Sequence, residues 1–375
     1  MSERTLKYLF YFAGTAGLIA FLAVRILPFF NLLLIEKKDP EYFEFTRYGE
    51  QYYASYISHF KEELPAPVDK YRMTDRNPEL NDCDLIAFGD SFFDFSRQKT
   101  VAERLHDSLN IRVHSEAGFL TYKDWYPLYY LSENKFQRGK QRFLIYEVVE
   151  RNIHDRFIAP HELVWTNANE SHEGITGIFR KARDFAFNSN SEDLYTVLLQ
   201  GSNLTSRIYS EIATIKFDLF GYISDKTPVY SLDQFSVPVL FYKQTVNDQP
   251  TSFYFNHTDD LIKTYVDNIA DLSEKLLKYY NLKLILVPVP NKFTIYVKKI
   301  RPFDKYDNFL PRLHRELDAR GIKNVNLYDD YISSDTLLYY GTDSHWNKKG
   351  VDIAVQKILE EIRHENSGNL DQSKP

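Results

Sequence analysis

Short apolar runs alternate with longer amphipathic stretches over most of the chain. The apolar runs are bounded by polar residues, which predicts β-strands. These strands are expected at 84–88, 111–114, 142–149, 282–287 and 325–328. Apolar residues spaced three and four apart predict helices. These helices are expected at 100–110, 122–135, 259–280, 304–320 and 348–363. The alternation predicts an α/β fold with a doubly wound, mostly parallel, five-stranded sheet covered by helices on both faces.

The interval 156–258 breaks this alternation. It combines helical pieces with joints rich in Gly, Ser, Asn and Pro. We interpret it as a helical insertion between strands three and four that forms a cap or a partner-binding surface. The segments 81–155 and 259–365 are then the two parts of one α/β domain, and the polar residues 366–375 predict a disordered tail.

The N-terminal segment carries an apolar run, 8–24, without a charged residue. With the apolar residues that follow, this run is long enough to cross a bilayer, which takes about 20 residues. Residues 1–35 are therefore predicted to be an uncleaved transmembrane anchor, with a cleaved signal peptide as the alternative. Basic residues on both sides leave the orientation open. Residues 36–80 are predicted to hold a membrane-proximal helix at 42–63 and a linker.

Composition excludes some classes of function. The net charge of −6 argues against a nucleic-acid partner. Cys83 is the only cysteine, so there is no intramolecular disulfide, and it is expected to be buried. His154 and Asp155 are adjacent, but no further ligands lie at a suitable spacing, so neither a metal site nor a cofactor is expected.

Two stretches carry residues suited to nucleophilic catalysis. Ser91 follows the first predicted strand, and the carboxyl ends of strands form the ligand-binding edge of an open α/β sheet. Asp343 and His345 lie two residues apart, far downstream. A serine needs a base to take its proton, and the base needs an acid to orient it. We therefore predict a catalytic triad of Ser91, His345 and Asp343. Candidate oxyanion donors are the backbone N–H groups of Ser91 and Gly118 and the Asn152 side chain.

These blocks resemble the SGNH/GDSL hydrolase superfamily. The matching blocks are Gly89-Asp90-Ser91, Gly118, Asn152, and the pair Asp343 and His345. The stretches 147–151 (EVVER), 290–296 (PNKFTIY) and 343–350 (DSHWNKKG) are also similar to the alginate acetylation proteins J and X, which are SGNH-like O-acetyltransferases of bacterial exopolysaccharide. In those proteins the acid–histidine block precedes the serine. Here the serine comes first, as in ordinary SGNH enzymes and in the membrane-anchored protein D of teichoic-acid D-alanylation.

The resemblance implies a membrane-anchored O-acetyltransferase that moves an acyl group through Ser91 to a hydroxyl of a cell-envelope or secreted polysaccharide. An acetylesterase with the same triad, and a non-catalytic scaffold that binds glycan or a partner, are open alternatives. The resemblance further implies a membrane-bound O-acyltransferase partner. It places the protein in the bacterial cytoplasmic membrane, as a single-pass protein with its catalytic domain on the periplasmic side.

Arg151 and Trp346 are the candidate substrate-binding residues. Arg151, with its neighbour Glu150, suits an anionic sugar because arginine pairs with carboxylates. A structural ion pair under the site is an equally open interpretation of these two residues. Lys292 follows the fourth predicted strand and is expected to be a surface lysine.

Overall fold

The computed structural model describes residues 5, 8, 11–19, 49, 57, 60, 62, 64–66, 77–95, 97–117, 127–158, 203–223, 229–232, 237–300 and 305–371. The chain divides into two compact units. One unit comprises 1–47, 52–61 and 165–222, and the other comprises 48–51, 62–164 and 223–375. The second unit contains the sheet and all the predicted site residues.

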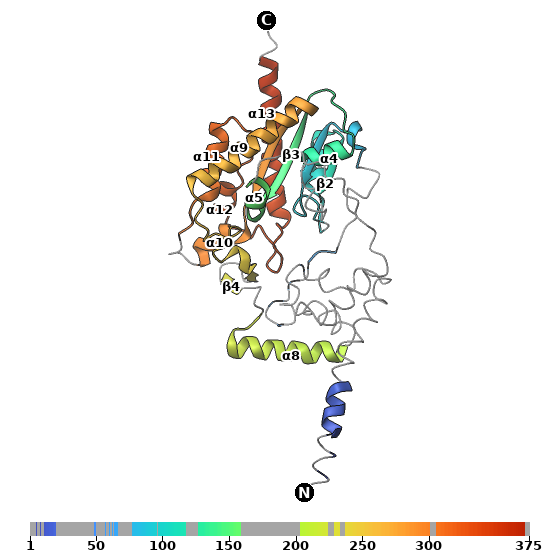
Figure 1. Cartoon of the computed structure of the whole chain (residues 1–375), viewed down its shortest axis with the longest axis vertical. Coiled ribbons are helices and arrows are strands. Elements are labelled where there is room, and N and C mark those ends of the chain that lie inside the picture. Colours follow the sequence, from blue (N-terminus) through green and yellow to red (C-terminus); the bar gives the residue numbers. More distant parts are fainter. Residues whose placement is uncertain are drawn as a thin grey trace. The chain divides into compact units, whose positions relative to one another are not determined.

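A parallel sheet forms the centre of the second unit (Figure 1). Its strands are β1 (Leu85–Gly89), β2 (Val113–Ala117), β3 (Arg142–Val149) and β6 (Leu282–Val289), in the order β2-β1-β3-β6. Every residue of β1 is buried. Because successive side chains of a strand point to opposite faces, helices must cover both faces of the sheet. The predicted α/β class and the parallel arrangement are confirmed.

The α-helices described in the second unit are α3 (Val101–Leu109), α4 (Pro127–Glu133), α5 (Glu150–Phe157), α9 (Asp259–Lys275), α10 (Lys292–Ile300), α11 (Phe309–Ala319), α12 (Tyr328–Ile332) and α13 (Lys348–Asp371). Five of them overlap the predicted helices, whereas α5, α10 and α12 were not predicted. α9 packs against α5 and α11, whereas α13 packs against α3. Thr100 and Thr258 cap α3 and α9, since each hydroxyl accepts a hydrogen bond from a backbone N–H of the first turn.

The predicted fifth strand at 325–328 is wrong for the described part of the chain. Pairing with β6 is limited to a parallel bridge between Leu286 and Asn324, with backbone hydrogen bonds on either side of it. Asn326 then accepts a hydrogen bond from the Tyr328 backbone N–H and donates one to Asp329. This local turn starts α12 and ends the pairing, which leaves the described sheet with four strands.

The predicted insertion divides between the two units. Helix α8 (Asn203–Phe220) belongs to the first unit and agrees with a helical piece expected there. Strands β4 (Val229–Leu232) and β5 (Val237–Leu240) form an antiparallel hairpin in the second unit. The described part of the insertion is therefore not purely helical.

The ends of the chain agree only partly with the sequence predictions. In the described part of the N-terminus, 11–19 is helical, and no described helix is both long and apolar enough to cross a membrane. The rest of the predicted anchor lies outside the described residues. The predicted helix at 42–63 is wrong where it is described, because Gly49 has a φ of 83° and the other described residues there are not α-helical. α13 continues to Asp371, into the predicted disordered tail.

Candidate active site

Ser91 lies in the turn that follows β1, and buried carboxyl groups hold this turn. The Asp90 backbone N–H donates to Glu147 Oε2 of β3 over 2.9 Å. One oxygen of the Asp90 carboxylate accepts from the Phe92 backbone N–H at 2.9 Å, and the other accepts from the Asn152 side-chain amide at 3.3 Å. These bonds on both sides of Ser91 hold its backbone at the carboxyl end of β1.

Glu147 leaves no space for a side chain at Gly89. A Cβ atom on Gly89 would lie 2.7 Å from Glu147 Oε2. Burial raises the pKa of Glu147 well above its usual value, and the neighbouring Asp90 carboxylate raises it further. Both causes favour the neutral form of the Glu147 carboxyl group beneath the Ser91 turn.

A tight loop presents Asp343 and His345. An antiparallel bridge between Tyr339 and Trp346 closes this loop. Asp343 Oδ1 accepts from the backbone N–H of His345 at 2.8 Å and lies 2.5 Å from the Nδ1 atom of the same residue. Both contacts involve one carboxylate oxygen, so they fix the ring relative to its own backbone. The proton is assigned to Nδ1, which leaves Nε2 as the acceptor.

The two stretches meet at Ser91, whose Oγ lies 2.7 Å from His345 Nε2. Asp343 and His345 are buried, whereas Ser91 is partly exposed. The rings of Phe95 and Phe92 lie 4.2 Å and 4.9 Å from the imidazole, centroid to centroid. The geometry thus brings the three predicted residues together in the order that a nucleophile, a base and an orienting acid require, with the hydroxyl as the accessible member.

Trp346, a candidate substrate-binding residue, and Lys292, an expected surface lysine, are both buried. Trp346 is fully buried and donates from its indole nitrogen to the Phe92 carbonyl at 2.9 Å, so its ring is not available to a substrate. Lys292 is only 5% exposed and is not a surface lysine. Its ammonium group contacts the loop of Asp343 and His345, a contact that no sequence spacing indicates.

The other candidate site residues lie around the Ser91 turn or outside the described residues. Asn152 is in the first turn of α5 and donates to Asp90. The Arg151 guanidinium lies 5.4 Å from the centre of the ring of Phe92, which is the residue after Ser91. Gly118 falls outside the described residues. These positions keep Arg151 and Asn152 as candidates for substrate binding and for the oxyanion hole.

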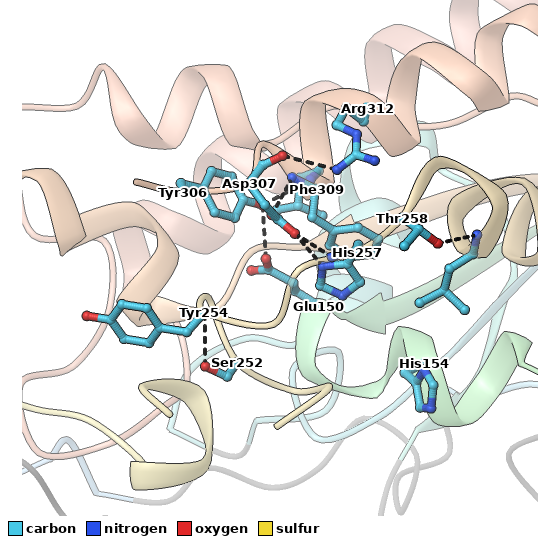
Figure 2. Close-up of polar contacts among 12 residues, drawn as sticks. Glu150, His154, Ser252, Tyr254, His257, Thr258, Tyr306, Asp307, Phe309 and Arg312 are labelled. Carbon is cyan, nitrogen blue, oxygen red and sulfur yellow. Dashed lines mark hydrogen bonds and ion pairs between the residues drawn. The ribbon is translucent and has the colours of Figure 1, made fainter. Parts of the chain in front are cut away.

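Glu150 belongs to a buried network rather than to an ion pair with Arg151. Figure 2 shows Glu150 with Tyr306, and the Tyr306 hydroxyl donates to Glu150 Oε1 at 3.0 Å. Glu150 Oε2 accepts from the Asn291 backbone N–H at 2.8 Å and from the Thr294 hydroxyl at 2.7 Å. Burial raises the pKa of Glu150 to about 7. These contacts give Glu150 a structural role, although not through the ion pair with Arg151 that the sequence left open.

The two residues considered above as metal ligands lie in the same helix as Glu150, α5. His154 Nδ1 lies 2.7 Å from the Tyr265 hydroxyl, and Asp155 follows it in α5. His257 Nδ1 lies 2.7 Å from Asp307 Oδ2, and this pair ties the segment before α9 to the segment before α11 (Figure 2). These histidines therefore link elements of the fold.

In a comparison with protein families, the C-terminal part of the chain matches a family model. Residues 240–374 match the family described as the SGNH hydrolase-like domain of the acetyltransferase AlgX. No curated protein and no solved structure gives a significant match. The matched range contains β6, Lys292, Asp343 and His345, and Ser91 lies ahead of it. Residues 240–374 are thus similar to the SGNH hydrolase-like domain of the AlgX type, which agrees with the resemblance drawn from the sequence.

Proposed function

We propose that the protein is an O-acetyltransferase that carries the acyl group on Ser91. The observation that supports this proposal most directly is the contact of Ser91 Oγ with His345 Nε2 at 2.7 Å, backed by Asp343 at 2.5 Å from Nδ1. The family match adds that the domain is of an acetyltransferase type. A serine, a base and an orienting acid are the parts that acyl transfer through a covalent intermediate needs.

In the proposed reaction, Ser91 Oγ attacks the carbonyl carbon of an acyl donor while His345 Nε2 takes the hydroxyl proton. The tetrahedral intermediate collapses, the donor's oxygen leaves, and His345 returns the proton to it. A sugar hydroxyl then attacks the acyl-enzyme, with His345 again as the base. Ser91 Oγ is the second leaving group and recovers its proton. Asp343 stabilises the imidazolium that forms in both halves.

The developing oxyanion needs fixed donors. We assign this role to the backbone N–H of Ser91 and the Asn152 amide, with the Gly118 N–H as a third candidate. Asn152 has two amide hydrogens, and Asp90 accepts one of them. Removal of a single oxyanion donor typically costs about 2.7 to 4 kcal/mol of transition-state stabilisation. Arg151, beside the Ser91 turn, is proposed to bind a charged group of the acceptor.

The acceptor is proposed to be a polysaccharide of the cell envelope or a secreted one. A membrane-bound O-acyltransferase would supply the acyl group on the periplasmic side. Both proposals rest on the family resemblance and on the charge-free run at 8–24. A reporter fused after residue 375 tests the location. We expect activity from a reporter that works only in the periplasm, and a cytoplasmic signal would contradict the proposal.

Two measurements separate the enzymatic alternatives. A serine-directed fluorophosphonate should label the wild-type protein and leave Ser91→Ala unlabelled; absence of labelling in both would favour a non-catalytic scaffold. Incubation with an acetyl ester, with and without an oligosaccharide, should then give acetylated sugar. If acetate is released and no acetylated sugar forms with any acceptor, the protein is an esterase, since the two activities differ only in what resolves the acyl-enzyme.

A further inference from the structure

Lys292 begins α10 and points its ammonium group at the loop that carries Asp343 and His345. Its Nζ atom lies 2.6 Å from the Tyr340 carbonyl oxygen, 2.7 Å from that of Gly341 and 3.1 Å from that of Asp343. A fourth carbonyl, that of Leu240 at the end of β5, lies 2.9 Å away. One buried cation thus contacts three peptide groups of the loop and one of the hairpin.

These contacts determine which way the loop faces. A carbonyl that accepts from Lys292 fixes the plane of its peptide group. With the Gly341 and Asp343 carbonyls turned towards the ammonium group, the 341–342 and 343–344 peptide planes, on either side of the Thr342–Asp343 peptide, are constrained. The carboxylate of Asp343, whose own carbonyl accepts from Lys292, meets the imidazole of His345. The Leu240 N–H also donates to the Gly341 carbonyl at 2.8 Å, so the hairpin restrains the same peptide.

A lysine suits this position better than other residues. Its compact ammonium group carries three donors in a tetrahedral arrangement, whereas the planar guanidinium of arginine directs its donors in a fork. Burial of a charge is costly unless hydrogen bonds compensate for it, and the four carbonyl oxygens do so here. An uncharged side chain of similar length would leave those carbonyls without this donor.

We propose that Lys292 is a positioning residue of the triad, which holds the 340–343 peptide groups so that Asp343 reaches Nδ1 of His345. This proposal rests on the proposed function of Ser91, His345 and Asp343 as a catalytic unit. It gives no contact with substrate to Lys292, which acts only through Asp343. It also assigns a role to the β4–β5 hairpin, as a support for the acid–histidine loop.

The test uses the full chain with Lys292→Met and Lys292→Arg. Lys299→Met is the matched control, because Lys299 lies in the same helix, is exposed and donates to the Ser334 carbonyl rather than to the 340–343 loop. We expect Lys292→Met to lower kcat for an acetyl ester by 10²- to 10⁴-fold with KM changed less than threefold, at a temperature well below its melting midpoint. Lys299→Met should match the wild type. Equal kcat for Lys292→Met and Lys299→Met would overturn the proposal.

A double variant and a spectroscopic signal complete the test. If Lys292 acts through Asp343, adding Lys292→Met to Asp343→Asn should reduce kcat less than threefold further, whereas a full multiplicative loss would contradict the proposal. The downfield proton resonance of His345 Nδ1 should be present in the wild type and in Lys299→Met and lost in Lys292→Met. Lys292→Arg takes the place of Lys292→Met if the latter does not fold. A wild type that shows this resonance but turns over no ester would refute the proposed function alone; persistence of the resonance in a folded Lys292 variant would refute the role of Lys292 alone.

Discussion

Ser91, His345 and Asp343 differ in exposure, and this difference sets what each substitution tests. Ser91→Ala removes a partly exposed hydroxyl and should abolish acyl-enzyme formation without lowering the melting temperature. His345→Ala should be nearly as inactive, because the two residues act as a unit. It also loses ring contacts with Phe95 and Phe92, so we expect it to melt earlier. Acetyl-ester turnover beside a thermal melt of each variant checks both expectations.

Asp343→Asn is the sharper substitution. Asparagine keeps an oxygen for the His345 backbone N–H, so the loop should stay folded. The neutral amide lacks the negative charge that stabilises the imidazolium, and in a comparable protease triad the same substitution costs about 10⁴-fold. Full turnover in Asp343→Asn would mean that Asp343 has only a structural role.

Gly49 lies close to the Asp343 carboxylate and leaves the space that this carboxylate occupies. A Cβ on Gly49 would lie 2.5 Å from Asp343 Oδ2, and its φ of 83° disfavours any other residue. Gly49→Ala should therefore displace the carboxylate and lower turnover at least tenfold, up to the loss of about 10⁴-fold expected when the acid is disabled. The backbone strain alone should cost about 1–2 kcal/mol of stability.

Gly321→Ala separates the two effects of the Gly49 substitution. Gly321 has a φ of 70°, and a Cβ there would have nothing within 4 Å. It should show a similar loss of stability in urea unfolding with unchanged turnover. If Gly49→Ala and Gly321→Ala lower turnover equally, the close approach of Gly49 to Asp343 does not contribute to activity.

At the scale of elements, Glu150 joins three helices through one carboxyl group. It begins α5, accepts from Asn291 and Thr294 at the start of α10, and accepts from Tyr306 ahead of α11. Burial raises its pKa from 4.5 to about 7. The folded state therefore binds this proton more tightly than the unfolded state, so the contribution to stability is present below about pH 4.5 and is lost as the pH rises to about 7.

Glu150→Gln should remove that pH dependence. From pH 4.5 to 8 the wild type should lose about 3 kcal/mol of unfolding free energy through this group, since one pKa unit corresponds to about 1.4 kcal/mol. The glutamine variant should give a flatter profile in urea unfolding at a series of pH values. Glu133→Gln, at an exposed position in α4, is the control and should keep the wild-type slope. Equal slopes in both variants would contradict the assignment.

Elements whose signal is local were predictable from the sequence, and those that depend on partners were not. The strand 142–149 has the bounds of β3 because its continuous apolar run needs no partner to be recognised. The run at 325–328 looks similar, but side-chain hydrogen bonds of Asn326 start a helix there. Within the site, the order of strands placed Ser91 and His345 on one edge. The contacts of Lys292 and Gly49 with the acid–histidine loop depend on tertiary packing that no spacing encodes.

At the scale of the whole molecule, the candidate site is divided between distant parts of the chain. Ser91 follows β1, whereas His345 and Asp343 lie in the range that matches the AlgX-type family. The two parts are joined by β3 and β6, which pair in parallel from Arg142 with Leu282 to Val149 with Val289. The site therefore requires both parts in one sheet.

Residues 240–375 expressed alone test this dependence. Without β3, the buried strand β6 would lose the neighbour with which it pairs along its whole length, and Ile285 and Val287, which are both 0% exposed, would face water. Exposing such side chains costs about 1.5–3 kcal/mol each, which is large against the usual total stability of about 5–15 kcal/mol. We expect the fragment to show no cooperative melt and no fluorophosphonate labelling. Full-length Ser91→Ala should also resist labelling but should melt cooperatively, which distinguishes a missing nucleophile from a missing fold. A cooperative melt of the fragment near the temperature of the full chain would mean that the matched domain folds without β3 and that the site is assembled from two independent parts.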